Sequence, residues 1–261
     1  MKNKLITSLI ALTALSAAHA QFSITDGNLT YVQDFNTLPT ANILATDESA
    51  PAWTDNSTLL GWYAGGGGFI SRFSVRDGTN GTPVGTGGAA APGSLGVNNT
   101  TDRAFAPMRQ NSDSFIGLRL VNDTGAVIPD FLISFTGEQW RSNNTDPGTL
   151  FFSYQVDAAS LTAGTWTAVS QLDFTSPVTT GLGALNGNDA ANQVSLSHTI
   201  TGINLEVGEE IWLRWANLRE TANNGTYLGI DDLSVAAIPE PGTLALVAIA
   251  LGSLAFFRRR K

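Results

Sequence analysis

Short apolar or alternating runs, separated by Gly, Asn, Asp, Thr and Pro, fill the chain between residues 21 and 237. Successive side chains of a strand point to opposite faces, so Leu150, Phe152 and Tyr154 fall on one face of their run. No amphipathic helix stands out in this part. We therefore predict an all-β fold, an antiparallel β-sandwich or jelly roll of about ten strands. The expected strands span residues 28–35, 58–64, 68–75, 114–122, 130–140, 149–156, 166–174, 193–200, 210–218 and 228–235.

A segment rich in Gly, Thr, Ala and Pro interrupts the pattern at about residues 77–99. Few of its side chains are large enough to anchor a core, so we expect a long surface loop there. The glycine run at residues 64–69 also suggests a phosphate-binding loop. That reading is excluded, because the chain lacks the G-x-x-x-x-G-K-[ST] pattern and has no lysine between residues 21 and 237.

The first 20 residues have the order of a secretory signal peptide. Lys2 and Lys4 precede an apolar run, and small residues follow at Ala18 and Ala20. Cleavage after Ala20 would leave residues 21–237 as one β-sandwich domain, since all-β domains of this size often form a single unit.

The last residues, 238–261, contain the second long apolar run of the chain, at 243–257. This run is shorter than the roughly 20 residues that usually cross a bilayer, although snorkelling or thinning can compensate. A basic cluster at the end would hold that end in the cytoplasm, with the preceding domain outside. The cluster consists of Arg258, Arg259, Arg260 and Lys261.

The tripeptide Pro239-Glu240-Pro241, the apolar span and the basic end together resemble the PEP-CTERM sorting signal of Gram-negative bacteria. The resemblance implies a membrane-bound processing enzyme of the exosortase type as a partner. It also implies export, transient anchoring in the inner membrane through a C-terminal helix, and delivery to the cell surface or extracellular matrix. The prolines should keep the tripeptide extended and open to such an enzyme.

The net charge of residues 21–237 excludes some classes of binding partner. Residues 21–237 contain eight arginines, no lysine and 21 acidic residues, a net charge of about −13. Such a surface repels phosphate backbones, so we expect no nucleic-acid partner. The chain has no cysteine, which excludes disulfides and thiolate chemistry despite the predicted export.

Few residues are suited to catalysis. His198 is the one histidine of residues 21–237, and it lies in an alternating run without a Gly-x-Ser-x-Gly motif elsewhere. Glu138 is the best carboxylate for a glycoside hydrolase, but no second strand glutamate stands out as its partner. The alternative is a solvated carboxylate paired with Arg141 or another arginine. We therefore expect a protein that is not an enzyme, with a glycoside hydrolase or lyase as the remaining catalytic alternative.

Asp231 and Asp232 stand near the end of the last expected strand, where alternation would send their side chains to opposite faces. The run "GIDDLSV" resembles the ending of exported MAM-like and lectin-like jelly rolls, some of which bind calcium there. One interpretation is thus a calcium site, because calcium prefers oxygen ligands. The other is a turn held by backbone hydrogen bonds.

Two tryptophans are candidate carbohydrate contacts. Trp140 follows Glu138 closely, and Trp212 lies on the opposite strand face from Trp215, so one of that pair should be partly exposed. The function we expect first is a structural or adhesive surface protein of a polysaccharide matrix or biofilm. A lectin-like carbohydrate-binding module is the alternative.

Overall fold

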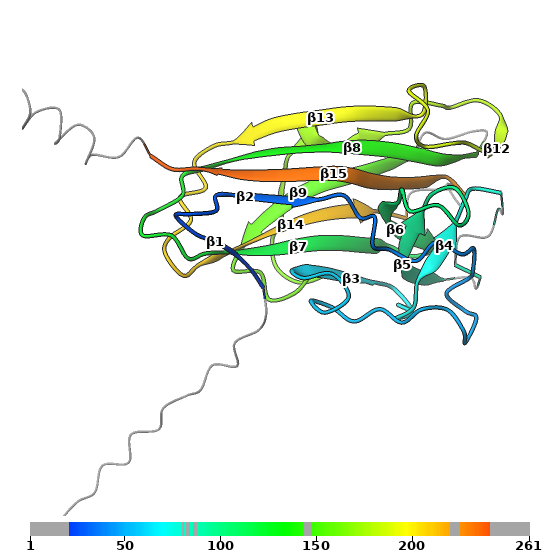
Figure 1. Ribbon diagram of the computed structural model, residues 1–261, viewed down its shortest axis with the longest axis horizontal. Coiled ribbons are helices and arrows are strands. Elements are labelled where there is room, and N and C mark those ends of the chain that lie inside the picture. The colour runs from blue at the N-terminus through cyan, green and yellow to red at the C-terminus, as the bar shows by residue number, and fades with distance from the viewer. Residues whose placement is uncertain are drawn as a thin grey trace, which may run out of the picture.

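The computed structural model describes residues 21–79, 81, 84–85, 88–143, 148–219 and 225–240. The all-β prediction is confirmed: within these residues, fifteen strands form two sheets, and one short 3₁₀ helix, η1, spans Ser170–Leu172. Figure 1 shows the two sheets as the layers of a sandwich. Within the described residues, no helix has the length and apolar character needed to cross a membrane. The predicted signal peptide and the predicted apolar span at 243–257 lie outside these residues.

The first sheet has seven strands with β7 and β14 at its centre. Their order is β1-β7-β14-β9-β10, with β3 also paired to β7 and β11 also paired to β9. The strands are β1 (Phe22–Ile24), β3 (Trp62–Gly66), β7 (Ser114–Asn122), β9 (Thr149–Val156), β10 (Thr167–Ala168), β11 (Phe174–Thr175) and β14 (Glu210–Asn217).

The second sheet has eight strands with β8 and β15 at its centre. Their order is β12-β8-β15-β6-β5-β4, with β13 also paired to β8 and β2 also paired to β15. The strands are β2 (Thr30–Gln33), β4 (Ser74–Arg76), β5 (Ala89–Leu95), β6 (Ala104–Gln110), β8 (Asp130–Asn143), β12 (Leu182–Ala184), β13 (Gln193–Ile200) and β15 (Tyr227–Ile238).

Alternation along the strands sends one set of side chains between the sheets, where aromatic rings pack among aliphatic side chains in the core. Trp62 of β3 and Trp215 of β14 are fully buried and stack with ring centroids 5.8 Å apart. Phe152 of β9 meets Trp215 edge-on, with centroids 5.1 Å apart. The opposite side chains of β7 and β14, among them Arg119 and Trp212, therefore belong to the outer face of the first sheet.

The expected surface loop at 77–99 is wrong for its second half. Residues 89–95 form β5, whose residues are all buried between β6 and β4. The small side chains allow close approach: a Cβ atom at Gly93 would lie only 2.3 Å from the Cγ atom of Met108. A strand can therefore be buried without large apolar residues when its neighbours supply them.

Both ends of the described chain lie at the same end of the sandwich. β1 pairs with residues 120–122, at the end of β7, while Ile238 at the end of β15 pairs with Asp130, at the start of β8. Figure 1 shows both ends leaving the left half of the molecule. The described chain therefore begins and ends at the same end of the domain.

Candidate functional site

A hollow of about 460 Å³ lies on the outer face of the seven-stranded sheet, where β3 meets a long loop. Tyr63 and Phe69 contribute half-buried aromatic rings, and Asp55 contributes a carboxylate. The loop side is lined by Ala159, Ser160, Leu161 and Thr162. The hollow thus combines aromatic surface, hydroxyl groups and one carboxylate.

Glycine residues of β3 shape the floor of this hollow. A Cβ atom built on Gly65 would meet nothing within 4 Å, so the space above this residue is open. At Gly66, by contrast, a Cβ atom would lie 2.2 Å from the carbonyl oxygen of Asp113. One glycine therefore leaves room for a ligand, and the next permits close packing of the chain.

The loop of residues 157–166, which we call the covering loop, lies over the outer face of β7 and β14. Leu161 occupies the space that Gly117 leaves, because a Cβ atom there would lie 2.3 Å from its Cδ2 atom. Arg214 Nη1 donates to the Leu161 carbonyl at 2.9 Å, and its guanidinium lies 3.9 Å from the centroid of Trp166. These contacts fix the loop wall of the hollow to the sheet.

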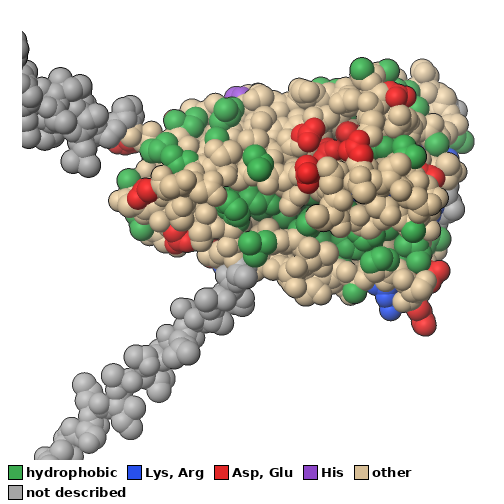
Figure 2. Space-filling view, in the orientation of Figure 1, with side chains coloured by type: hydrophobic (Ala, Val, Ile, Leu, Met, Phe, Trp, Pro, Cys, Tyr) green, Lys and Arg blue, Asp and Glu red, His purple; other side chains and the backbone are tan. Residues whose placement is uncertain are grey.

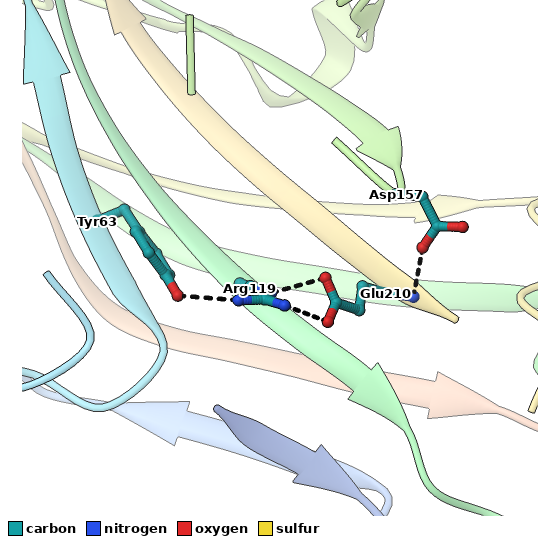
Figure 3. Close-up of polar contacts among 4 residues, drawn as sticks. All are labelled: Tyr63, Arg119, Asp157 and Glu210. Carbon is teal, nitrogen blue, oxygen red and sulfur yellow. Dashed lines mark hydrogen bonds and ion pairs between the residues drawn. The ribbon is translucent and has the colours of Figure 1, made fainter. Parts of the chain in front are cut away.

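A chain of polar contacts positions Tyr63, as Figure 3 shows. Arg119 of β7 donates to both carboxylate oxygens of Glu210, with the Nε to Oε2 distance at 2.7 Å. Its Nη1 donates to the Tyr63 hydroxyl at 3.2 Å. The hydrogen bond to Glu210 is the main cause that raises the pKa of Arg119. The backbone N–H of Glu210 in turn donates to Asp157 Oδ1 at 3.1 Å, at the start of the covering loop.

Trp212, one of the two predicted sugar contacts, lies at this hollow but is only 4% exposed. Tyr63 packs on it with ring centroids 4.6 Å apart, and Arg119 lies 5.6 Å from its centroid. The expected opposite faces of Trp212 and Trp215 are confirmed, but the expected exposure of Trp212 is wrong because these groups and the covering loop cover its ring. The accessible aromatic surface belongs to Tyr63 and Phe69 instead.

Trp140, the other predicted sugar contact, is 1% exposed and packs in a second buried cluster with Met108 and Tyr227. Its indole N–H donates to Glu138 Oε2 at 2.9 Å. A ring in this position offers no free face to a sugar, so the prediction is wrong for Trp140. The expected pairing of Glu138 with Arg141 is also wrong, since Arg141 donates to the carbonyl oxygen of Gly78.

A β-bulge interrupts β15 at the predicted aspartate pair, since the register with β8 shifts between Asp231 and Ser234. Ile230 and Leu233, on either side of the pair, are both buried in the core. Between them, Asp231 is only 5% exposed, whereas Asp232 is exposed. Asp232 takes a positive φ of 49°, and its N–H donates to Asp231 Oδ1 at 2.7 Å.

This bulge belongs to an acidic region on the outer face of the eight-stranded sheet. Burial raises the pKa of Glu138 to about 7 and that of Asp231 to about 8, and the negative charges of Asp102 and Asp232 add to both shifts. Figure 2 shows acidic side chains gathered on one face of the sandwich. Among the described residues, no group of three or more His, Cys, Asp or Glu side chains is placed to hold a metal ion. The predicted calcium site at Asp231 and Asp232 stays a prediction.

The predicted sorting tripeptide starts directly after the last strand. Pro239 and Glu240 are exposed and follow β15 without regular structure. Pro241 and the basic residues Arg258, Arg259, Arg260 and Lys261 lie outside the described residues, as do Ala18 and Ala20 at the predicted cleavage site. The predicted tripeptide therefore follows directly on a folded sheet.

Sequence reasoning missed Asp55, Tyr63, Gly65 and Phe69 as site residues. They come together with residues 159–162, which are nearly a hundred positions away in the chain. The run "WYAGGGGF" contained the signal, since aromatic residues flank glycines there. Strand alternation could not show that a distant loop would build the opposite wall.

Residues 237–261 match the PEP-CTERM protein-sorting motif. The predicted resemblance is confirmed for this segment, and the chain is an exported protein that is sorted through the membrane. No curated protein matches the chain.

Several solved structures are distantly similar. The carbohydrate-binding module TmCBM61 in complex with beta-1,4-galactotriose is 14% identical with a TM-score of 0.30, covering 54% of this chain and 74% of its own. A xylan-binding domain from CBM 22 is 11% identical with a TM-score of 0.32, covering 73% and 97%. The enzymatically active domain of tailspike protein 4 of bacteriophage CBA120 is 9% identical with a TM-score of 0.34, covering 75% and 22%. At such TM-scores, the ligands of those proteins say nothing about the ligand of this chain.

Proposed function

We propose that this exported, PEP-CTERM-sorted chain is a non-enzymatic surface protein that attaches to a polysaccharide through the hollow beside Tyr63. The tail delivers the domain to the cell envelope, where an exosortase-type enzyme processes it. The domain then holds on to polysaccharide at the cell surface or in the extracellular matrix. This combines the adhesive role expected from the sequence with the carbohydrate-binding alternative.

The observation that carries the proposal is the open, aromatic-lined hollow above Gly65. Sugar rings present C–H groups on one face and hydroxyls at the edge, so a binding site needs aromatic surface next to polar groups. Tyr63 and Phe69 supply the rings, while Ser160, Thr162 and the Asp55 carboxylate supply polar atoms. The Arg119 bond to Tyr63 holds its ring before the ligand arrives, which lowers the entropic cost of binding.

The carboxylate count at the hollow favours binding over hydrolysis. Glycoside hydrolases usually place two carboxyl groups across the scissile bond. Among the described residues that line the hollow, Asp55 is the one carboxylate. We therefore propose binding without turnover at this site.

The test introduces a larger side chain at Gly65, on the floor of the hollow. We expect the purified full-length protein in detergent to bind members of a polysaccharide array, and Gly65→Leu to weaken that binding at least tenfold. Leucine at this position meets no protein atom within 4 Å at its Cβ, so the variant should fold. Gly27→Leu is the matched control, because a Cβ atom there also meets nothing within 4 Å, in the turn between β1 and β2.

A second variant, Tyr63→Ala, removes the half-buried ring and should also weaken binding. Melting curves of each variant separate lost folding from lost affinity. Binding that survives both Gly65→Leu and Tyr63→Ala in folded protein would place the ligand elsewhere and refute the proposal. Shortened polysaccharide chains after long incubation would contradict the non-enzymatic part.

A further inference from the structure

The formal charge at the hollow is negative. Asp55 carries the one formally charged side chain among the described residues that line it. Asp55 Oδ1 accepts hydrogen bonds from Trp53 Nε1 at 2.6 Å and from the backbone N–H of Ala64 at 3.0 Å. Both bonds use the same oxygen, which fixes the carboxylate at the edge of β3 and leaves Oδ2 for a ligand.

Two arginines on the outer face of the same sheet, Arg119 and Arg214, are already engaged. The Arg119 guanidinium is paired through two of its nitrogens with the Glu210 carboxylate, and its third nitrogen donates to Tyr63. Arg214 is held between the Trp166 ring, the Ser153 hydroxyl and the carbonyl of the covering loop. Neither arginine lines the hollow, so no guanidinium of the described residues is presented to an anionic ligand there.

The net charge of the whole domain is negative, as is the formal charge at the hollow. Residues 21–237 carry a net charge of about −13, with eight arginines and no lysine. A polymer with regularly spaced carboxylate or sulfate groups would be repelled during its approach, most strongly at low salt. A neutral polymer meets no such barrier.

Sugar hydroxyls suit the free carboxylate oxygen. A carboxylate accepts hydrogen bonds from hydroxyl donors, and such charge-assisted bonds are the stronger kind. A uronate at the same place would put two negative charges together without a cation between them. Resting on the proposed function, we infer that the hollow selects neutral polysaccharides and disfavours chains that carry uronate or sulfate groups.

The experiment compares neutral and anionic forms of the same backbone. Fully methyl-esterified homogalacturonan is paired with its de-esterified form, and neutral cellulose oligosaccharides are paired with 6-carboxylated ones. Full-length protein is titrated with each in low-salt buffer containing a chelator, which prevents a divalent cation from bridging two carboxylates. We expect each neutral member that binds to have a Kd at least tenfold lower than its anionic counterpart.

Asp55→Asn tests the residue that causes the selection. Asparagine keeps the Oδ1 acceptor for Trp53 and Ala64, so the site should stay folded. We expect the Kd for neutral polymer to rise about fivefold or more, because the acceptor loses its charge, and the discrimination against anionic polymer to shrink. Asp34→Asn is the control: it makes the same change in net charge at a separate hollow on the eight-stranded sheet.

The outcomes separate the two claims. Equal or tighter binding of the anionic polymers, blocked by Gly65→Leu, would overturn the neutral selectivity and keep the hollow as the binding site. A discrimination that Asp34→Asn reduces as much as Asp55→Asn would also overturn it, since net charge alone would then be the cause. If the protein binds neither pair of polymers and no polysaccharide on an array, the proposed function is overturned, and the inference fails with it.

Discussion

Glu138 lies in a central strand of its sheet with its carboxyl group withdrawn from water. It is 5% exposed, and among the described residues its carboxylate accepts a hydrogen bond from the uncharged Trp140 indole N–H and forms no ion pair with an arginine. Burial therefore raises its pKa to about 7. At the same time, Asp231 has a pKa raised to about 8, again mainly by burial. These two residues make the fold sensitive to pH near neutrality.

We expect the stability of the protein to fall as pH rises from 5 to 8. A carboxyl group whose folded pKa lies above its unfolded pKa binds more protons when folded, so its contribution is fully present below the unfolded pKa of about 4 and is lost as pH rises through the folded pKa. For Glu138 the loss is at most about 3 kcal/mol. Glu138→Gln, which can still accept from Trp140, should flatten the pH dependence of the melting temperature. The exposed Glu206→Gln control should leave the dependence unchanged; an equal effect of both variants would contradict this explanation.

At the residue scale, the sequence predicted the strand in which a tryptophan lies better than it predicted the solvent exposure of the ring. Trp140 lies in a strand that was predicted, but its ring is buried in a cluster that includes Val84, Met108 and Tyr227 from three other parts of the chain. Trp212 was placed on the correct strand face, yet Tyr63 and the covering loop hide it. Exposure depends on such long-range contacts, and local alternation contains no information about them.

At the element scale, strands with regular alternation were predicted accurately. The expected runs 114–122, 149–156 and 193–200 coincide with β7, β9 and β13. β5 and β6 were missed because their residues are buried on both faces and include Ala, Gly and Pro instead of an alternating pattern. The bulge in β15 was missed because alternation alone assumes an uninterrupted register.

The bulge restricts which residues can stand at position 232, and this can be tested. Its φ of 49° lies in the left-handed region, which Asp, Asn and Gly tolerate and β-branched residues avoid. Asp232→Val should therefore lower the free energy of unfolding by about 1–2 kcal/mol, whereas Asp232→Gly should lower it little or not at all. Chemical denaturation of both variants measures the difference. Equal losses would show that the side chain matters and the backbone conformation does not.

Calcium is tested on the same bulge. If the carboxylates of Asp231 and Asp232 bind calcium, millimolar calcium should raise the melting temperature by mass action, and a chelator should remove the increment. Since the site would take oxygen ligands from both residues, Asp231→Asn and Asp232→Asn should each reduce that increment. Identical melting temperatures in calcium and in chelator would leave the pair as a hydrogen-bonded bulge.

At the scale of the whole molecule, the β-sandwich domain and the sorting motif adjoin each other. The sorting motif covers residues 237–261, and β15 ends at Ile238, so the two overlap at the end of the strand. Ala237 is still bonded to the sheet, because its N–H donates to the Leu29 carbonyl at 2.8 Å. An enzyme that cut at the tripeptide would therefore work within a few residues of the folded sheet.

Replacing Pro239-Glu240-Pro241 with three alanines should leave an uncut, full-length form in the inner membrane. Alanine restores the amide hydrogens and the helix propensity that the prolines exclude, so the segment would lose its extended, accessible form. Fractionation and mass spectrometry of the exported protein check this, with Val32→Ala on the exposed face of β2 as a control. An unchanged mature mass would show that the tripeptide does not direct processing.

The last strand of the chain is also a central strand of its sheet. β15 pairs with β8 and β6 within the eight-stranded sheet and also with β2, so the second layer cannot close before residues 227–238 have been made. During synthesis, β2, β6 and β8 cannot complete their pairing before these residues, the last of which already belong to the sorting motif, have been made. A chain that ended before residue 227 would therefore lack both the central strand β15 and the sorting motif. The strand that completes the eight-stranded sheet and the motif that sorts the protein are synthesised together, at the end of translation.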